Sequence, residues 1–365
     1  MRVLLVGPYP PPHGGISVHV AQAHQFLNRH GAECRVLNID RTAGPSPEYE
    51  RVRHGFDLVR IVLAHAVQRR IIHVHINGHN RKAWFLAAVC ALASSPAPAR
   101  LLTLHSGMAP AYVDSARGIR RRLLKRVCLL YSRIVCVNSL IRRSILSLGI
   151  PSSRACILPA FLPPSLVRQI VPRELWEWME SHRPLLSTAL FFRPEYGFDL
   201  LVDAMSHLQS RHPHAGCLVM GSREGMDSER AGVERKGLAS HFRFLGDINH
   251  DLCLGLMSRS DVYVRPARVD GDSISVREAL HLGVPVVASD VGVRPSAARI
   301  FRAGNVPEMV ARIEQALSQN HCPPPEPQSA RTQSGLRTLL DVYQGLDGCD
   351  VPAGFPEAFP RASGD

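Results

Sequence analysis

The stretch DVYVRPARVDGDSISVREALHLGVPVVASDVG, residues 261–292, decides the fold that we predict for this chain. Residues 262–264 and 284–288 are apolar runs typical of buried strands, and Gly283 ends the helix expected between them. Strand, helix and strand make a βαβ unit of a parallel sheet. The polar loop 270–275 leaves the first strand and enters the helix, where ligands bind in open α/β sheets and free N–H groups favour anions. This loop is the first place to look for function.

Two carboxylates flank the loop. Asp270 stands at its entrance and Glu278 lies eight positions later, in the first turn of the helix, so both could face a ligand held over the helix end. A structural alternative exists, because Ser275 followed by Glu278 matches a capping box in which the glutamate bonds the backbone N–H of the serine. On spacing alone the capping role is the commoner explanation.

The same stretch resembles the E-x7-E region of the retaining glycosyltransferases of family 4. Asp270 stands in the place of the first glutamate, Glu278 is the second, and EALHLGVPVVAS, residues 278–289, continues as in that family. The resemblance implies that Glu278 holds the ribose of a nucleotide-sugar donor. It further implies that the donor sugar is held by Asp270 and by the backbone amides of Gly271, Asp272, Ser273 and Ile274.

The composition is that of an ordinary globular protein. A length of 365 residues suggests two domains, and 45% hydrophobic with 20% charged residues excludes a disordered or fibrous chain. No stretch approaches the roughly 20 apolar residues that a membrane span needs. Residues 2–7 are typical of a buried first strand rather than of a signal peptide. We therefore expect a cytoplasmic protein.

Cysteine spacing and net charge indicate which kinds of site and which partners to expect. The nine cysteines show no C-x-x-C pairs, which predicts reduced core residues rather than a disulfide framework or a zinc site. The net charge of +12 indicates anionic partners: nucleic acid, a phospholipid surface or phosphorylated substrates.

The first half opens with a strand, a glycine-containing loop and a helix over residues 18–29. Gly14 and Gly15 can let the backbone approach a phosphate, and Ser17 can cap the helix, although a plain turn is the commoner explanation of a glycine pair. The arrangement lacks G-x-G-x-x-G, which disfavours a dinucleotide-dependent dehydrogenase. It resembles the amino-terminal loop of the family, which implies that both glycines face the donor diphosphate.

Two histidines follow predicted strands of the same half. His75 lies in the apolar run 71–76, and His105 ends the strand that starts at Arg100, on the same rim as the glycine loop. A core or surface position is the default for each. The resemblance implies that His105 lies at the transferred sugar and His75 near the acceptor.

Residues 115–126 place six cations beside apolar side chains and predict a basic amphipathic helix. The cations of 117–126 could bind an anionic membrane surface, each contributing about 1 kcal/mol. A solvated helix face explains the pattern equally well. Nucleic acid is not expected, because no RRM, KH or zinc-finger signature accompanies the charge.

Strands and helices alternate along both halves, which predicts two doubly wound, Rossmann-like α/β domains facing each other across a cleft, the GT-B fold. The predicted parts are an N-terminal, acceptor-side domain (1–165), a linker (166–184), a nucleotide-sugar-binding domain (185–320), a crossing segment and helix that pack back on the first domain (321–346) and a disordered tail (347–365).

The chain departs from the family pattern after the first strand of the second half. Members carry an arginine and a lysine that neutralise the donor diphosphate, and Phe191 and Tyr196 stand at those positions here. Arg193 lies in the same loop, so we expect it to substitute; Arg265, Arg268 and Arg277 are further cations near the central loop.

No metal is expected. The run from Asp270 to Asp272 has the form of a D-x-D metal motif, but that motif belongs to a different, single-domain fold, and carboxylates on a loop are usually solvated. Transfer by this family needs no metal, and the leaving diphosphate can act as the base, which fits a sequence without a strong nucleophile. The donor is a substrate, so no cofactor is expected.

The resemblance implies a retaining hexosyltransferase that moves a sugar from a nucleotide-sugar donor to a glycan or lipid-linked acceptor in cell-surface polysaccharide synthesis, such as exopolysaccharide, capsule or lipopolysaccharide. It would act as a peripheral protein on the inner face of the cell membrane. Two further functions stay open: a sugar-nucleotide epimerase or hydrolase on the same fold, and an inactive homologue that serves as a binding subunit.

Overall fold

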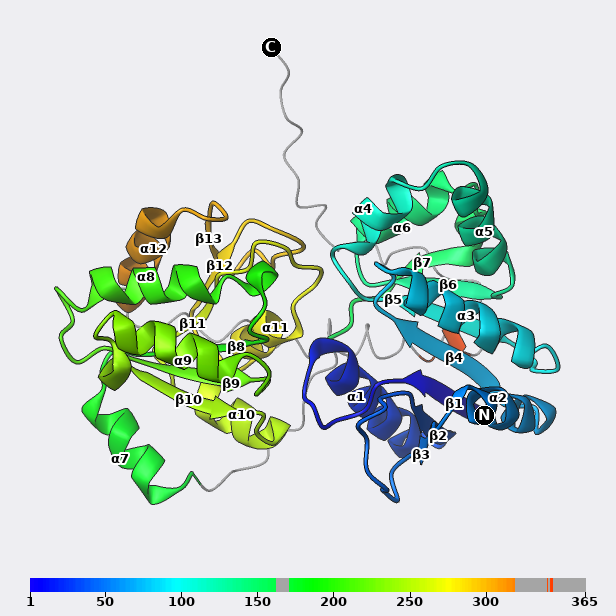
Figure 1. Cartoon of the computed structure of the whole chain (residues 1–365), viewed down its shortest axis with the longest axis horizontal. Coiled ribbons are helices and arrows are strands. Elements are labelled where there is room, and N and C mark those ends of the chain that lie inside the picture. The colour runs from blue at the N-terminus through cyan, green and yellow to red at the C-terminus, as the bar shows by residue number, and fades with distance from the viewer. Residues whose placement is uncertain (162–170, 319–339, 341, 344–365) are drawn as a thin grey trace, which may run out of the picture.

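The computed structural model describes residues 1–161, 171–318, 340, 342 and 343. Two α/β domains stand side by side, each built on a parallel sheet with helices packed on its faces (Figure 1). This is the predicted pair of Rossmann-like domains.

The N-terminal domain holds a seven-stranded sheet in the order β3-β2-β1-β4-β5-β6-β7. Val3 and Leu5 point to the face covered by α1, while Leu4 and Val6 point to the opposite face and the core under α2 and α3. This alternation follows from the period of two along a strand, and it explains why β1 is apolar throughout. The strands are β1 (Arg2–Gly7), β2 (Glu33–Asn38), β3 (Glu50–Arg51), β4 (Ile71–Ile76), β5 (Arg100–Leu104), β6 (Arg133–Cys136) and β7 (Ala155–Ile157). The helices are α1 (Gly15–Arg29), α2 (Gly55–Val67), α3 (Arg81–Ala93), α4 (Ala109–Asp114), α5 (Gly118–Leu129) and α6 (Ser139–Ser147).

The C-terminal domain repeats the design with six strands in the order β10-β9-β8-β11-β12-β13. Its strands are β8 (Leu185–Leu190), β9 (Gly216–Gly221), β10 (Phe242–Gly246), β11 (Val262–Arg265), β12 (Val286–Ser289) and β13 (Arg299–Phe301). Its helices are α7 (Arg173–Ser181), α8 (Phe198–Leu208), α9 (Met226–Arg235), α10 (His250–Met257), α11 (Ile274–His281) and α12 (Val306–Ser318).

Helix α7 corrects the predicted linker over 166–184. Leu175 and Met179 are buried and pack in one cluster with Leu185, Leu218 and Met220 of the second sheet. The sequence suggested a linker because prolines flank the helix, but the apolar face of the helix belongs to the C-terminal domain.

Two residues of the final segment lie on the first domain. Val342 and Tyr343 are buried with Val3 and Leu5, and the Tyr343 hydroxyl bonds Nδ1 of His73. They lie where the returning helix was predicted. Leu340 packs against the same cluster and is partly buried. The other residues of the crossing segment, and residues 344–365 with the predicted disordered tail, fall outside the described residues.

Each sheet reverses its order at one point, between β1 and β4 in the first domain and between β8 and β11 in the second. Loops leave the carboxyl ends of these strands in opposite directions there, which opens a crevice for ligands. Within the part of the chain that the structure describes, no helix combines the length and the apolar character needed to cross a membrane.

Candidate functional site

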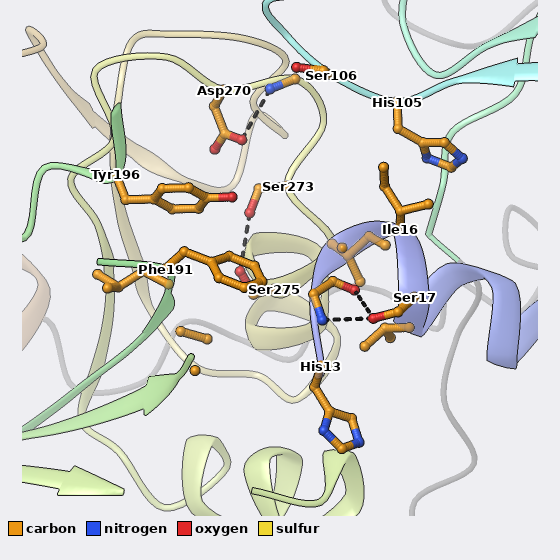
Figure 2. A pocket seen from close by; sticks show the side chains of 18 of the residues that line it. His13, Ile16, Ser17, His105, Ser106, Phe191, Tyr196, Asp270, Ser273 and Ser275 are labelled. Atoms are coloured by element: carbon orange, nitrogen blue, oxygen red, sulfur yellow. Dashed lines mark hydrogen bonds between the residues drawn. The ribbon is translucent and has the colours of Figure 1, made fainter. Parts of the chain in front are cut away.

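A cleft of about 410 Å³ lies between the two domains at these crevices. Figure 2 shows His13, Ile16, Ser17 and His105 on one side and Phe191, Tyr196, Asp270 and Ser273 on the other. Among the predicted site residues, the cleft is lined by Gly14, Gly15, His105, Arg193, Asp270, Gly271, Asp272, Ser273, Ile274 and Glu278. Segments separated by more than 150 positions thus form one site.

Glycines let the two domains touch beside the cleft. A Cβ atom built on Gly107 would lie 1.9 Å from the backbone oxygen of Asp270, and one on Gly271 would lie 2.9 Å from the oxygen of His105. Contacts this short are impossible for side chains. The loop after β5 and the loop after β11 therefore meet backbone to backbone, with His105 beside the central loop.

The amino end of α1 forms one wall. Gly14 is the N-cap residue, and the hydroxyl of Ser17 accepts a bond from its N–H at 2.9 Å. A Cβ atom on Gly14 would lie 2.7 Å from the ring of Phe191, so the aromatic ring covers this glycine across the cleft. The predicted position of Gly14 and Gly15 facing a ligand site agrees with the cleft lining.

The amino end of α11 forms the opposite wall. Asn80 and Asn138 cap α3 and α6 with their side chains, whereas Ser273, the N-cap of α11, makes no side-chain cap bond. Its hydroxyl is paired with that of Ser275 at 3.1 Å. The first N–H groups of α11 thus lack a side-chain partner at a cleft, which suits an anion or a sugar hydroxyl.

Glu278 is buried and pairs with His250 of α10, with 2.7 Å between Oε1 and Nε2. Burial alone would lower the pKa of His250, but the hydrogen bond and the charge of Glu278 outweigh it and raise the pKa. The capping-box alternative is wrong, because α11 begins at Ile274 and the carboxylate is bonded to His250. No pattern in the sequence pointed to this partner.

Asp270 is held between two arginines. Its carboxylate accepts from Nε of Arg265 at 3.0 Å and from Nη2 of Arg294 at 3.0 Å. Burial would raise the pKa of Asp270, but the two guanidinium groups hold it below its ordinary value. Asp272 has one arginine partner, Arg277, whose Nε lies 2.6 Å from Oδ1, and burial raises the pKa of this second carboxylate. Both aspartates thus serve at least as anchors for arginines, and a direct bond of Asp270 to a sugar stays a prediction.

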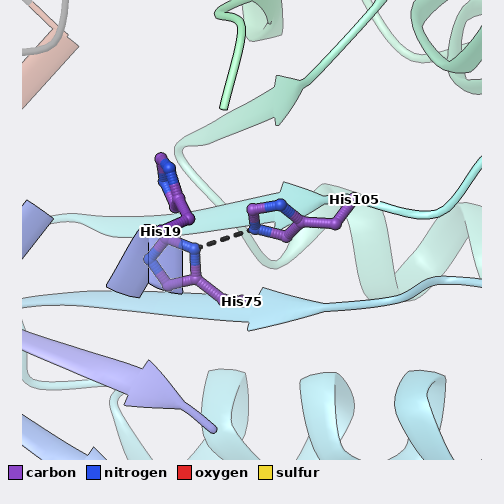
Figure 3. A group of neighbouring side chains, drawn as sticks. All are labelled: His19, His75 and His105. Atoms are coloured by element: carbon purple, nitrogen blue, oxygen red, sulfur yellow. Dashed lines mark hydrogen bonds between the residues drawn. The ribbon is translucent and has the colours of Figure 1, made fainter. Parts of the chain in front are cut away.

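Histidines from three elements meet behind the N-terminal wall. Figure 3 shows His19 of α1, His75 of β4 and His105 after β5, with Nδ1 of His75 bonded to Nε2 of His105 at 3.1 Å. Nδ1 of His19 is bonded to the backbone oxygen of Ala160 at 2.6 Å. Burial, and after it neighbouring histidines, lowers the pKa of His75 and of His105 well below the ordinary value. Both rings are neutral at physiological pH.

His75 corrects an acceptor-side prediction. It is 1% exposed and does not line the cleft, because its side chain points to the face of the sheet that α1 covers, where its ring lies tilted beside that of His73. Its contact is with His105, which does line the cleft. His19 was not identified from the sequence, since a histidine inside a helix pattern carries no positional signal.

The three imidazoles are also the described group whose geometry could hold a metal ion, with ligand atoms within 4.8 Å of one another. Neutral imidazole is a common ligand of zinc and copper. Nδ1 of His19 and the facing nitrogens of His75 and His105 already have protein partners. The metal-free site therefore stays our prediction.

Arg193 lies at the edge of the cleft. Its side chain is 56% exposed and pairs with Glu224 at 3.7 Å, and its guanidinium lies 5.5 Å from the centre of the Phe191 ring. Arg193 can reach a donor bound in the cleft. Because its side chain is exposed, water screens its charge and the contact would be weak.

Family sequence models match both halves of the chain. The model of Glycosyltransferase Family 4 matches residues 13–166, and that of Glycosyl transferases group 1 matches residues 183–331. The two matches together cover most of both described domains and leave out β1 and α7.

Curated relatives and solved structures agree with the family models. The phosphatidyl-myo-inositol mannosyltransferase of Mycobacterium leprae is 25% identical over 340 residues, which covers 87% of this chain and 85% of the relative. The lipopolysaccharide core biosynthesis mannosyltransferase LpsB of Rhizobium meliloti is 36% identical over 105 residues, 27% of this chain and 29% of the relative. The crystal structure of HepE from Anabaena in complex with UDP-glucose superposes with a TM-score of 0.70 at 15% identity, covering 95% of this chain and all of that one. The chain has the GT-B fold and belongs to the glycosyltransferases of family 4.

Proposed function

We propose that this protein is a retaining glycosyltransferase that moves a hexose from a nucleotide-sugar donor to a glycan or lipid-linked acceptor in the synthesis of cell-surface polysaccharide. The observation that carries the proposal is the uncapped amino end of α11, which opens into the interdomain cleft beside Glu278. A nucleotide-sugar supplies what this wall can bind: ribose hydroxyls for a carboxylate, and phosphate and sugar oxygens for N–H groups.

The arrangement of groups supports transfer. Glu278 is fixed by His250, so its carboxylate is oriented before a ribose arrives, and His105 stands across the cleft close to the loop that would hold the sugar. A neutral imidazole can accept a hydrogen bond from a sugar hydroxyl or donate one to it. The transfer would retain the anomeric configuration without a nucleophilic side chain. The leaving diphosphate of the donor would then act as the base that deprotonates the incoming hydroxyl.

The N-terminal domain carries a surface that suits a lipid-linked acceptor. In Figure 1, α2, α3 and α5 lie on the side of the domain away from the C-terminal domain. Large apolar side chains on these three helices are exposed, and α5 carries exposed arginines as well. The apolar members are Phe56, Leu63, Phe85, Leu92, Ile119 and Leu123, and the arginines are Arg122 and Arg126.

We infer that this surface rests on the anionic inner leaflet of the cell membrane, because exposed apolar groups beside cations bind the headgroup region. The names of the two curated relatives, one acting on a phosphatidyl-inositol and one in lipopolysaccharide synthesis, fit such an acceptor. Both names also make mannose donors the first to test.

The test is thermal unfolding of the wild type and Glu278→Ala with UDP-, GDP-, ADP- and dTDP-sugars in the absence of metal. A ligand at about 100 times its Kd stabilises by about 2.7 kcal/mol, which raises the Tm of a domain of this size by a few degrees. We expect one nucleotide to shift the wild type and not the variant. Glu177→Ala, which removes an exposed carboxylate paired with Arg173, is the control.

A protein that no nucleotide-sugar stabilises would overturn the proposal. An inactive binding subunit would then be the leading function, and the absence of both usual cations at Phe191 and Tyr196 already favours it over an epimerase or a hydrolase. Stable association with a second glycosyltransferase would be the next measurement.

A further inference from the structure

Two buried guanidinium groups share one carboxylate at the floor of the cleft. Asp270 binds Arg265 through both oxygens, at 3.0 and 3.2 Å, and Arg294 through one, at 3.0 Å. The three side chains are 8%, 6% and 10% exposed for Arg265, Arg294 and Asp270. The neighbouring Asp272 is matched by its own partner, Arg277. These ion pairs contain one more cation than anions.

An uncompensated buried charge is costly, so such a cluster favours an anion at its open side. Of the arginines in the cluster, Arg265 lines the cleft, whereas Arg294 and Arg277 are not among the lining residues. It ends β11, the strand at the point where the order of the second sheet reverses, which is where ligands of open α/β sheets bind. The excess charge therefore faces the ligand position.

The guanidinium group of Arg265 lies against Tyr196, 4.9 Å from the centre of the ring. Tyr196 occupies the place of the lysine that is usual after the first strand of this domain. Burial raises the pKa of Tyr196, so the phenol is neutral and its face attracts the cation. The side chain of Arg265 thus brings a positive charge from the neighbouring strand to the position that the lysine has lost.

Arg265 keeps donors for a ligand. Its Nε and Nη2 atoms donate to Asp270 and its Nη1 atom donates to the backbone oxygen of Ala189 at 2.9 Å. A guanidinium group carries five N–H bonds, and these contacts, the ones made with described residues, use three. One N–H on each terminal nitrogen is left, in the planar geometry that suits phosphate oxygens.

We propose that Arg265, held in place by Asp270 and Arg294, binds the diphosphate of the nucleotide-sugar donor and replaces the two cations missing at Phe191 and Tyr196. The inference rests on the proposed function and deepens it. It also gives Asp270 a role different from that of a sugar ligand: the carboxylate orients Arg265 and keeps the arginine pair buried. Arg193, exposed and paired with Glu224, is then a minor contributor.

The test is isothermal titration of UDP, GDP, ADP and dTDP, and of the four corresponding nucleosides, into the wild type, Arg265→Met, Arg265→Lys and Arg193→Met. Removing a charge-assisted bond of this kind typically weakens binding by about 10- to 100-fold. We expect that loss for the nucleoside diphosphate with Arg265→Met, a smaller loss with Arg265→Lys, and unchanged nucleoside binding in both. Arg193→Met, which removes the other candidate cation of the cleft, should lose less than about threefold, and Arg173→Met, which removes an exposed arginine paired with Glu177, is the control.

The folding of Arg265→Met is checked by its Tm without ligand. Removing one of two cations leaves Asp270 paired with Arg294, so we expect the Tm to stay close to that of the wild type. Arg265→Lys keeps the charge and gives the same test if the methionine variant does not fold.

The outcomes separate this inference from the proposed function. A wild type that binds none of the four nucleoside diphosphates contradicts both. A wild type that binds one of them, with Arg265→Met binding it equally well, contradicts the inference alone. Equal loss for the nucleoside and the diphosphate in Arg265→Met would also overturn it, because the arginine would then support the whole site and not the phosphates.

Discussion

Nε2 of His105 lies 3.1 Å from Nδ1 of His75, so the histidine that lines the cleft is supported by a buried histidine of the neighbouring strand. Both rings are neutral because burial, with neighbouring histidines, lowers their pKa values well below 6.5. One of the two nitrogens must carry the shared proton. The bond to His75 fixes the orientation of the His105 ring at the edge of the cleft.

His105 should therefore act as a neutral group. We predict that His105→Asn lowers kcat by about 100-fold, the loss typical of one hydrogen bond made to the transition state. Because the ring carries no charge at either pH, the ratio of wild-type to variant kcat should be the same at pH 6 and pH 8. A wild-type profile with a break near pH 6.5 that His105→Asn abolishes would contradict the neutral ring.

Gly107 should be intolerant of a side chain. A Cβ atom would lie 1.9 Å from the oxygen of Asp270, which is backbone and cannot rotate away, so Gly107→Ala should push the two domains apart. We expect a loss of at least about 10-fold in kcat/KM, since displacement of reacting groups by about 1 Å has effects of this order or larger. A rise in the radius of gyration by X-ray scattering would show the opening.

Gly44→Ala is the control for this substitution, because nothing lies within 4 Å of its added Cβ. Equal activity of Gly107→Ala and Gly44→Ala would show that the contact between the two loops is dispensable.

The surface on α2, α3 and α5 should bind anionic lipid. Each cation near an anionic leaflet contributes about 1 kcal/mol, so reversing Arg122 and Arg126 to glutamate should weaken binding to phosphatidylglycerol vesicles by at least about 10-fold. Co-sedimentation measures this. The control variant carries glutamate in place of Arg235 and Arg302, two exposed arginines of the C-terminal domain. Equal weakening by both pairs would show that only net charge matters.

Sugar transfer should survive removal of metal. We predict that EDTA leaves the rate unchanged and that elemental analysis finds no stoichiometric transition metal, because nitrogens of His19, His75 and His105 are bonded to protein groups. One equivalent of zinc that disappears in His19→Ala would contradict this and identify the histidines as a metal site.

The sequence predicted the elements whose apolar pattern is local. The strand Val262–Arg265, the helix Ile274–His281 and the loop between them follow from residues that are neighbours in the chain. Strand β3 was missed, because Glu50 and Arg51 are polar and become a strand only by pairing with β2. Helix α4 and strand β13 were missed for the same reason: each is short, and tertiary packing stabilises it.

For the site, too, the sequence predicted what neighbouring residues determine and did not predict contacts between distant ones. The sequence brought Asp270 and Glu278 to one loop and helix end, but their partners could not be predicted, since Arg294 is 24 positions from Asp270 and His250 is 28 positions from Glu278. A buried carboxylate needs a partner, yet the sequence does not say which cation supplies it. An arginine at the end of the apolar strand β11 was the available signal for the anion site.

Sugar transfer itself is the most direct test of the proposed function. The donor that stabilises the protein is labelled in its sugar and incubated with lipid extract from the source cells, and label in the lipid and glycan fraction is measured for the wild type and Glu278→Gln, which keeps the size of the side chain and removes its charge. We predict labelled product with the wild type, its anomeric linkage retained, and at least about 100-fold less with the variant. Release of free sugar without labelled product, or equal transfer by both proteins, would contradict the proposed function.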